Sequence, residues 1–276
     1  MEIKVKTMSE WQQEGKEPEI LFWVGSAGSF DERAKKITRE FVNILNFCRI
    51  DFGVLGTEES ASGDVAKRSG NEFLFQMQAL MNIQVLNSYK INRIVTTCPH
   101  DYNTIKNEYK SLGGVYEVYH HTEFISELIK SNKLNLNEIY NDAIITYHDP
   151  CYLGRGNNIY KSPRELLRNS GAKISEMKRF KNKSFCCGAG GAQMFKEPEK
   201  GNQDININRT KEALDTLGFN LNKLDTNFKK KRKIIATGCP FCNTMLTDGI
   251  KNQNKESEVE VLDIVEIISK AKKDFL

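Results

Sequence analysis

Cysteines are the residues of this 276-residue sequence best suited to chemistry, and there are seven of them. Five lie in the second half of the chain: Cys151, the adjacent pair Cys186 and Cys187, and then Cys239 and Cys242, which are separated by two residues. A disulfide framework is not expected, because the count is odd and neighbouring cysteines do not easily reach the Cα separation of ~4.4–6.8 Å that a disulfide needs. The remaining uses for such a set are metal or cluster ligation, redox chemistry and core packing.

The composition restricts the class of protein. Hydrophobic residues make up 39% and charged residues 28% of the chain, with a net charge of +4, as in a soluble globular protein of one large or two small domains. The longest apolar run, residues 20–24, is far shorter than the ~20 residues that span a bilayer. Residues 1–16 are charged and do not resemble a secretory signal. We expect a cytoplasmic protein that neither inserts into a membrane nor binds nucleic acid.

The elements that would position these cysteines alternate along the chain. Short β-branched runs predict strands over residues 20–24, 52–55, 93–96, 116–119, 143–147, 173–177, 233–236 and 259–262. Helical periodicity predicts helices over residues 31–47, 71–88, 103–110, 122–130, 163–169, 205–217, 243–251 and 263–272. This alternation predicts an α/β fold with mainly parallel sheets and flanking helices. Residues 131–141 are expected to be a linker, and residues 216–233, which end in a basic run, a solvated loop.

The two halves of the sequence repeat one another. The first two matched positions are 35 residues apart in both halves, and the next interval is 37 residues in the first half and 53 in the second. The matched pairs are Ser26 with Cys151, Ala61 with Cys186, Cys98 with Cys239, and Asp101 with Cys242. We therefore predict two pseudo-symmetric tandem modules, residues 1–140 and residues 141–276.

Only the second module keeps all of its thiols. In the first, Ser26, the pair Ala61 and Ser62 (opposite Cys186 and Cys187) and Asp101 stand where the second module has cysteine, and only Cys98 remains at a matched position. Serine and aspartate offer hard oxygen atoms, which are poor substitutes for thiolates in iron–sulfur chemistry. We interpret the first module as a degenerate former site. Cys48, at helical spacing behind apolar residues, is expected in the core.

Each cysteine element of the second module follows a predicted strand or begins a predicted helix. The carboxyl ends of parallel strands meet at one edge of a sheet, so we expect these thiols to converge. Backbone N–H groups and helix N-termini at that edge favour thiolates. His148, three residues before Cys151, is a candidate to orient a bound group by hydrogen bonding or to carry a proton; equally, it is an ordinary histidine at a strand end.

This pattern resembles the cysteine-rich CCG domain, which occurs twice in heterodisulfide reductase (in its B-type component) and in iron–sulfur proteins of lactate, glycolate and glycerol-3-phosphate oxidation. The resemblance implies that Cys151, Cys186, Cys187, Cys239 and Cys242 hold a [4Fe–4S]-type cluster, of cubane or non-cubane form. It also implies electron transfer or disulfide reduction beside partner subunits that carry flavin or further clusters. Since the first module has a cysteine at only one of the five matched positions, we expect one cluster.

Two other functions remain open from the sequence. The same cysteines suit a structural zinc ion in a scaffold module without redox function, although zinc takes four ligands and five are present. Cys239 and Cys242 also have the spacing of a thiol–disulfide oxidoreductase, which would leave the other three cysteines unexplained.

Overall fold

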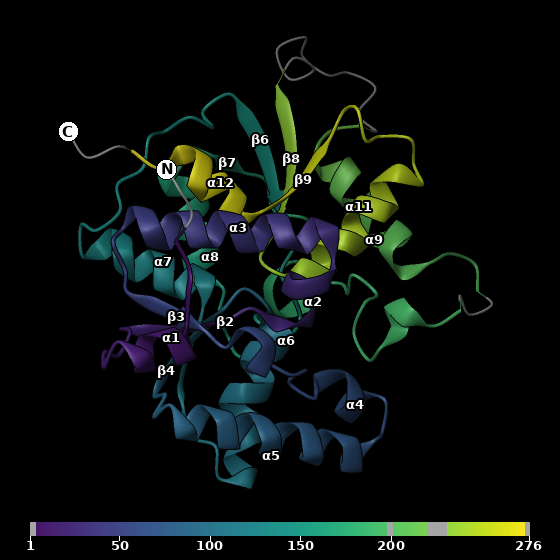
Figure 1. Cartoon of the computed structure of the whole chain (residues 1–276). Coiled ribbons are helices and arrows are strands. Elements are labelled where there is room, and N and C mark those ends of the chain that lie inside the picture. The colour runs from purple at the N-terminus through teal and green to yellow at the C-terminus, as the bar shows by residue number, and fades with distance from the viewer. Residues whose placement is uncertain (1–3, 198–200, 220–230, 274–276) are drawn as a thin grey trace. The chain divides into compact units, whose positions relative to one another are not determined.

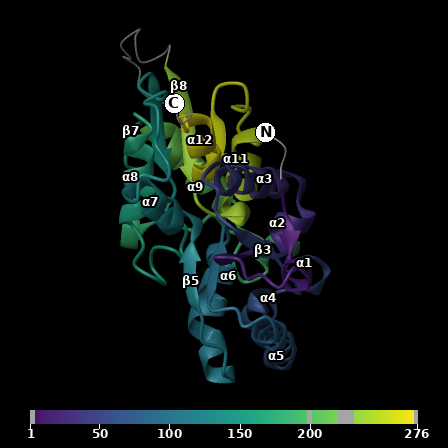
Figure 2. The ribbon, with the colours of Figure 1, turned by 60° about the vertical axis from the view of Figure 1, so that its left-hand side comes forward.

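The computed structural model describes residues 4–197, 201–219 and 231–273. It divides the chain into two compact units, Met1–Lys133 and Leu134–Leu276 (Figures 1 and 2). Each unit has its own parallel sheet with helices packed against it. The predicted α/β class with two tandem modules is therefore confirmed.

The first unit contains a five-stranded sheet in the order β1-β3-β2-β4-β5, and every neighbouring pair is parallel. Phe22 of β2 and Phe41 of α3 pack edge to face, with ring centroids 5.0 Å apart. The strands are β1 (Lys6–Thr7), β2 (Ile20–Trp23), β3 (Phe52–Val54), β4 (Arg93–Thr96) and β5 (Glu117–His120). The helices are α1 (Met8–Gln13), α2 (Gly25–Phe30), α3 (Glu32–Phe47), η1 (Gly56–Glu58), α4 (Asp64–Arg68), α5 (Glu72–Ser88), α6 (Pro99–Asn103), η2 (Thr104–Glu108), η3 (Tyr109–Leu112) and α7 (His121–Lys130).

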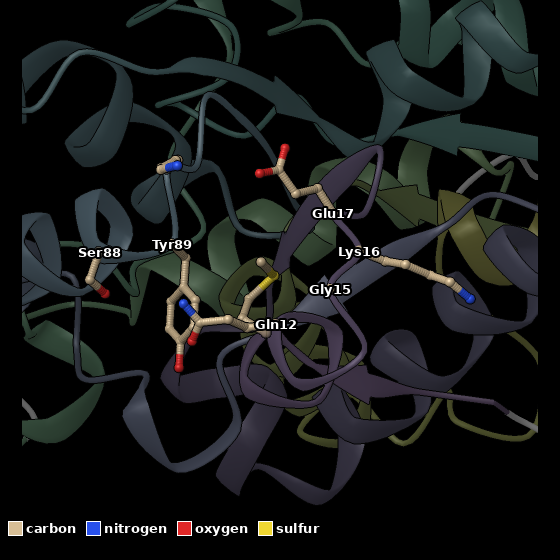
Figure 3. A pocket seen from close by; sticks show the side chains of 8 residues that line it. Gln12, Gly15, Lys16, Glu17, Ser88 and Tyr89 are labelled. Atoms are coloured by element: carbon tan, nitrogen blue, oxygen red, sulfur yellow. The ribbon is translucent and has the colours of Figure 1, made fainter.

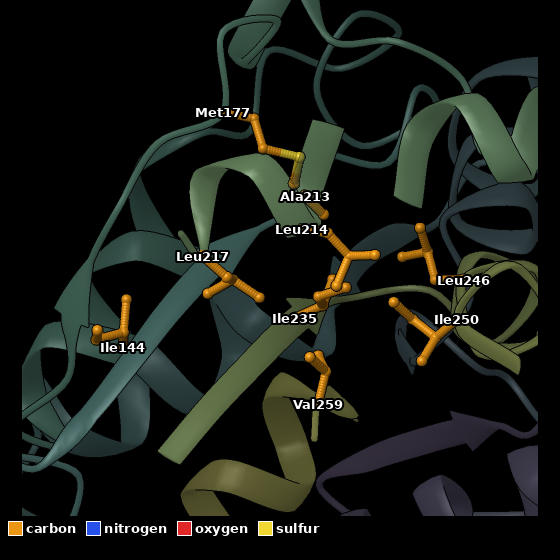
Figure 4. Packing of buried hydrophobic residues seen from close by; sticks show 9 residues of the cluster. All are labelled: Ile144, Met177, Ala213, Leu214, Leu217, Ile235, Leu246, Ile250 and Val259. Atoms are coloured by element: carbon orange, nitrogen blue, oxygen red, sulfur yellow. The ribbon is translucent and has the colours of Figure 1, made fainter. Parts of the chain in front are cut away.

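The second unit contains a four-stranded parallel sheet in the order β7-β6-β8-β9. The strands are β6 (Ala143–Tyr147), β7 (Lys173–Ile174), β8 (Arg232–Thr237) and β9 (Glu260–Asp263). The helices are α8 (Lys161–Asn169), η4 (Lys181–Lys183), η5 (Gln193–Phe195), α9 (Ile205–Thr216), α11 (Pro240–Lys251) and α12 (Ile264–Ala271). Figure 4 shows the core between this sheet and its helices, a cluster that includes Ile144 of β6, Leu214 of α9 and Leu246 of α11.

The repeat seen in the sequence is also a repeat of topology. The order β3-β2-β4-β5 in the first unit corresponds to β7-β6-β8-β9 in the second. In both units the two central strands are therefore followed by the segments that the sequence matched. Strand β1 is an additional edge strand of the first unit.

Some elements differ from the sequence prediction. Helices α6 and α11 begin at Pro99 and Pro240, three to four residues earlier than predicted, because proline is favoured at the first helical position. The segment predicted as one helix over residues 103–110 is the end of α6 followed by a π turn (η2) and a 3₁₀ turn (η3). Helices α1, α2 and α4 and strand β1 were not predicted.

The two predicted loops are shorter in the structure. Residues 134–141 of the expected linker are tied to the second unit: Asn137 N–H donates to Ala271 O (2.7 Å) and Tyr140 N–H to Ser170 O (3.1 Å). In the basic loop, residues 220–230 lie outside the described part of the chain, and Arg232 already begins β8. Within the residues that the structure describes, no helix combines the length and apolar character needed to cross a bilayer.

Candidate metal centre

The five cysteines of the second unit follow the carboxyl ends of its two central strands or lie in the loop between them. Cys151 comes four residues after β6 ends, and Cys239 follows β8 and forms the N-cap of α11, which places Cys242 in its first turn. Cys186 and Cys187 follow the short turn η4. Because β6 and β8 are adjacent and parallel, these segments share one edge of the sheet.

The five thiols form a continuous chain of contacts. Cys151 is hydrogen-bonded to Cys186, Cys186 to Cys187, Cys187 to Cys242, and Cys242 to Cys239. Cys187, Cys239 and Cys242 are buried, whereas Cys151 and Cys186 are half-buried. The structure thus brings together all five residues that the sequence singled out.

The electrostatics of these thiols favour a bound cation. Hydrogen bonding to Cys186, together with burial, raises the pKa of Cys151, and the Cys186 thiol likewise raises the pKa of Cys187. Hydrogen bonds from the Cys151 and Cys187 thiols lower the pKa of Cys186, whose Sγ also accepts from the Gly188 N–H at 3.3 Å. One thiolate is stabilised at the expense of its neighbours, and a metal cation would compensate several negative sulfur atoms at once.

His148 lies beside these thiols. Its side chain is buried, and one of its ring nitrogens lies with Cys187 Sγ and Cys242 Sγ in a group whose atoms are all within 4.8 Å of one another. Its Nδ1 accepts a hydrogen bond from Arg209 Nε at 3.0 Å. Burial and the Arg209 charge lower the pKa of His148 well below its ordinary value, so the imidazole is neutral.

Asp149, next to His148, joins the loops that carry the cysteines. Its carboxylate accepts two hydrogen bonds of 2.8 Å from the guanidinium of Arg164 and one of 2.7 Å from the Lys181 N–H. Its carbonyl oxygen accepts from Ser184 Oγ at 3.0 Å. These bonds tie the segment leading to Cys151 to the segment leading to the Cys186–Cys187 pair.

The matched residues of the first unit are only partly together. Ser26 and Ala61 are exposed, and they are not part of the buried group around Asp101. Asp101 is buried and accepts a hydrogen bond from Ser62 Oγ at 2.5 Å, and the Cys98 thiol is hydrogen-bonded to the same carboxyl group. Ser62, which matches Cys187, therefore contacts Asp101, the residue that matches Cys242.

The correspondence is close. In the second unit Cys187 and Cys239 both contact Cys242, and in the first unit Ser62 and Cys98 both contact Asp101. The same pattern of contacts is present in both units, with a carboxyl group at its centre in the first.

Glu59 completes the polar cluster of the first unit. Its carboxyl oxygens accept from the backbone N–H groups of Val24 (3.0 Å) and Gly25 (2.6 Å), directly after β2. Burial raises the pKa of Glu59 to about 8, against the effect of these two N–H groups, and raises the pKa of Asp101 to about 6. Nothing in the sequence spacing indicated a role for Glu59.

Among the described residues, the group around His148 is the one place where three possible metal-ligating side chains lie within 4.8 Å of one another. A pocket of the first unit, lined by Gln12, Gly15, Lys16, Glu17, Ser88 and Tyr89, lies elsewhere (Figure 3). Glu17 precedes β2, so the pocket is near the amino end of that strand, whereas Ser26 follows its carboxyl end. It includes none of the predicted site residues.

A model of the CCG cysteine-rich domain matches this chain twice, over residues 21–106 and residues 145–247. The chain belongs to the CCG cysteine-rich domain family. The resemblance noted from the cysteine spacing is thereby confirmed. Both halves match, including the first, which has a cysteine at only one of the five matched positions.

Three curated proteins illustrate the relatives of this CCG-domain chain. It is 43% identical over 271 residues to the probable iron-sulfur-binding oxidoreductase FadF of Bacillus subtilis, covering 98% of this chain and 36% of FadF. It is 39% identical to the EtfAB:quinone oxidoreductase of Syntrophomonas wolfei (94% of this chain, 35% of the relative). It is 29% identical to the D-type component of the dihydromethanophenazine:CoB–CoM heterodisulfide reductase of Methanosarcina barkeri (92% and 59%). The chain thus spans about a third of the length of the first two.

Proposed function

We propose that this chain binds one [4Fe–4S]-type cluster through Cys151, Cys186, Cys187, Cys239 and Cys242, and that it transfers electrons as part of a larger cytoplasmic oxidoreductase. The observation that carries the proposal is the chain of contacts among all five thiols at one edge of the second sheet. Thiolates are the usual ligands of iron–sulfur clusters.

The surroundings of the five thiols fit such a group. Asn243, directly after Cys242, is fully buried, and neither polar atom of its side chain has a hydrogen-bond partner among the described residues. A buried amide without a partner is uncommon in a folded protein, and sulfur atoms of a bound cluster are acceptors that would satisfy its NH2 group. The partly buried Met194, Phe241 and Met245 pack against the buried cysteines and limit access of water.

The residues of the first unit support one cluster rather than two. Asp101 and Ser62 satisfy one another through their 2.5 Å hydrogen bond, and Ser26 and Ala61 are exposed. This set offers one thiol, Cys98, and otherwise oxygen atoms, which are poor ligands for iron–sulfur chemistry.

A bound cluster supplies one-electron redox chemistry, and the chain supplies the environment. The cysteines hold it, and Asp149 keeps two of the ligand loops together. Cys151 and Cys186 are the half-buried members of the set, so we place electron exchange with a partner on their side. Two relatives are named as a quinone oxidoreductase and as a component of a heterodisulfide reductase, which supports a place for this chain in a larger redox complex. We expect its partner subunits to carry flavin or further clusters.

Iron analysis tests the proposal. Protein purified without oxygen should contain about four iron and four acid-labile sulfide ions per chain. Cys187→Ala should lose most of this iron, because a buried ligand is removed. Cys98→Ala is the matched control, since Cys98 is an equally buried thiol of the first unit, and it should leave the iron content unchanged.

Two outcomes would contradict the proposal. A colourless protein loaded with zinc would favour a scaffold with a structural metal. Turnover of disulfide substrates by metal-free protein, abolished in Cys239→Ser, would favour a thiol–disulfide oxidoreductase. Cys239 is 0% and Cys242 2% exposed, and an attacking thiol of that class must be accessible.

A further inference from the structure

Arg209 is a fully buried arginine that no spacing in the sequence connects with the cysteines. It lies on α9, and its side chain is 0% exposed. Its Nη1 donates to Glu212 Oε2 (3.0 Å) and to the carbonyl oxygen of Arg179 (2.9 Å), and its Nε donates to His148 Nδ1 (3.0 Å). These three hydrogen bonds fix the position of the guanidinium group. They therefore also fix the direction in which its Nε–H points.

The contact between Arg209 and His148 determines which ring nitrogen carries a proton. A guanidinium group is always charged and only donates hydrogen bonds, so Nδ1 of His148 must accept and carries no proton. The neutral ring then has its proton on Nε2. Without such a partner, the two neutral forms of an imidazole compete.

The imidazole adjoins the proposed ligands. One of its nitrogens lies within 4.8 Å of the sulfur atoms of Cys187 and Cys242, while Nδ1 is occupied by Arg209. We propose that Arg209 is a positioning residue that fixes His148 with its proton on Nε2, so that this N–H donates to a sulfur atom of the group held by Cys187 and Cys242. The inference rests on the proposed function for the identity of that group.

An N–H donor of this kind changes the redox equilibrium. Reduction adds negative charge to the sulfur atoms, and a hydrogen bond to them stabilises the reduced state. A hydrogen bond to a charged group contributes about tenfold or more to an equilibrium. Loss of the donor should therefore shift the ratio of reduced to oxidised protein about tenfold toward the oxidised form, or ~59 mV for a one-electron couple.

A double-mutant cycle tests whether Arg209 acts through His148. The reduction potential would be measured for wild type, His148→Phe, Arg209→Met and the double variant. We expect each single variant to have a lower potential and the double variant to fall by less than the sum of the two single shifts. Additive shifts, or no shift in His148→Phe, would overturn the inference while the iron content still supports the proposed function.

Arg179→Met is the matched control for charge. Arg179 also pairs with Glu212, at 2.8 Å, and its side chain is 37% exposed, but its side chain donates to Glu212 and Asn208 rather than to His148. In this background the potential should still respond to His148→Phe by the full amount seen in the wild type. A response that disappears would assign the effect to charge rather than to position.

A second measurement does not depend on iron. The chain has four histidines, so nitrogen NMR of protein labelled at histidine, as purified, can assign His148 from the signals that vanish in His148→Phe. We expect a neutral ring protonated at Nε2 in the wild type and a mixture of forms in Arg209→Met. A proton on Nδ1, or an unchanged single form in Arg209→Met, would overturn the role of Arg209. A wild type without iron but with this tautomer would instead overturn the proposed function and the donation to cluster sulfur.

Discussion

At the scale of residues, the two units use different chemistry in the same three positions. Cys187, Cys242 and Cys239 contact one another through sulfur in the second unit. In the first unit a hydroxyl and a thiol both hydrogen-bond the buried carboxyl group of Asp101. The carboxyl group is satisfied by these hydrogen bonds without a metal, whereas several thiolates gathered together require a cation to balance their charge. We interpret Asp101 as the centre of a metal-free version of the site.

The carboxyl groups of the first unit predict a pH dependence of stability. The pKa of Glu59 is raised from 4.5 to about 8 in the folded protein, so the native state binds more protons than the unfolded state between these values. The contribution of Glu59 is complete below about pH 4.5 and is lost as the pH rises through 8. It amounts to a few kcal/mol, at about 1.4 kcal/mol per pKa unit.

Glu59→Gln isolates this effect. The variant loses one hydrogen bond to a backbone N–H at all pH values, at a cost of about 1 kcal/mol, but its unfolding midpoint should no longer fall between pH 6 and 8. The decrease of the unfolding midpoint as the pH rises to 6 should remain, because the pKa of Asp101 is raised to about 6. Urea unfolding followed by tryptophan fluorescence measures both, and equal slopes for wild type and variant above pH 6 would contradict the assignment.

Asp149 predicts a large effect on the second unit. Asp149→Ala leaves the buried Arg164 guanidinium, 4% exposed, with Glu176 as its remaining acidic partner, and breaking a buried ion pair costs about 3–5 kcal/mol. The thermal midpoint should fall and cluster iron should be lost more quickly to a chelator. Asp142→Ala, which removes an exposed carboxylate just before β6, is the control and should behave as wild type.

At the scale of elements, much of the fold could be predicted from the sequence. The central strands are buried β-branched runs, so β4 and β6 were predicted to the residue. Helix α2 was missed because its six residues include two glycines and two serines, which are poor helix formers. It is stabilised by packing against α3, where Thr38 Oγ1 donates to Gly28 O at 3.3 Å. Contacts of this kind join distant segments and leave no local pattern.

The site residues that the sequence did not predict were missed for the same reason: their contacts join distant segments and leave no local pattern. The cysteines were found because their spacing recurs along the chain. Arg209 is 61 residues from His148, and Glu59 acts through backbone N–H groups 34 and 35 residues away. A single charged side chain on an ordinary helix or loop carries no periodic signal, so only the folded structure reveals these contacts.

The loop around the adjacent cysteines depends on one glycine. Gly188 has φ +94°, and a Cβ atom there would lie 3.2 Å from Ile205 Cβ. Gly188→Ala should cost on the order of 1–3 kcal/mol through backbone strain and should lower the iron content by moving Cys186 and Cys187. Gly201→Ala, where a Cβ atom meets nothing within 4 Å, should leave thermal stability and iron unchanged. Full iron retention in Gly188→Ala would show that the loop adapts.

At the scale of the whole molecule, the second unit is proposed to need a metal cluster, whereas the first unit is proposed to need none. Both tryptophans of the chain, Trp11 and Trp23, belong to the first unit. Removing iron from the intact protein should therefore leave the unfolding transition seen by tryptophan fluorescence largely unchanged. Hydrogen exchange should increase in peptides of the second unit, around residues 143–151 and 232–242. A loss of protection spread evenly over both units would contradict this division.

The replacement of sulfur by oxygen in the first unit also limits where the chain can be damaged. Thiolates are oxidised stepwise to sulfenic, sulfinic and sulfonic acids, whereas serine and aspartate side chains are inert to the same reagents. Cys48 and Cys98, the two thiols of the first unit, are both buried. Exposure to peroxide should therefore concentrate irreversible modification on the half-buried Cys151 and Cys186, and the first unit would outlast the proposed redox activity of the second.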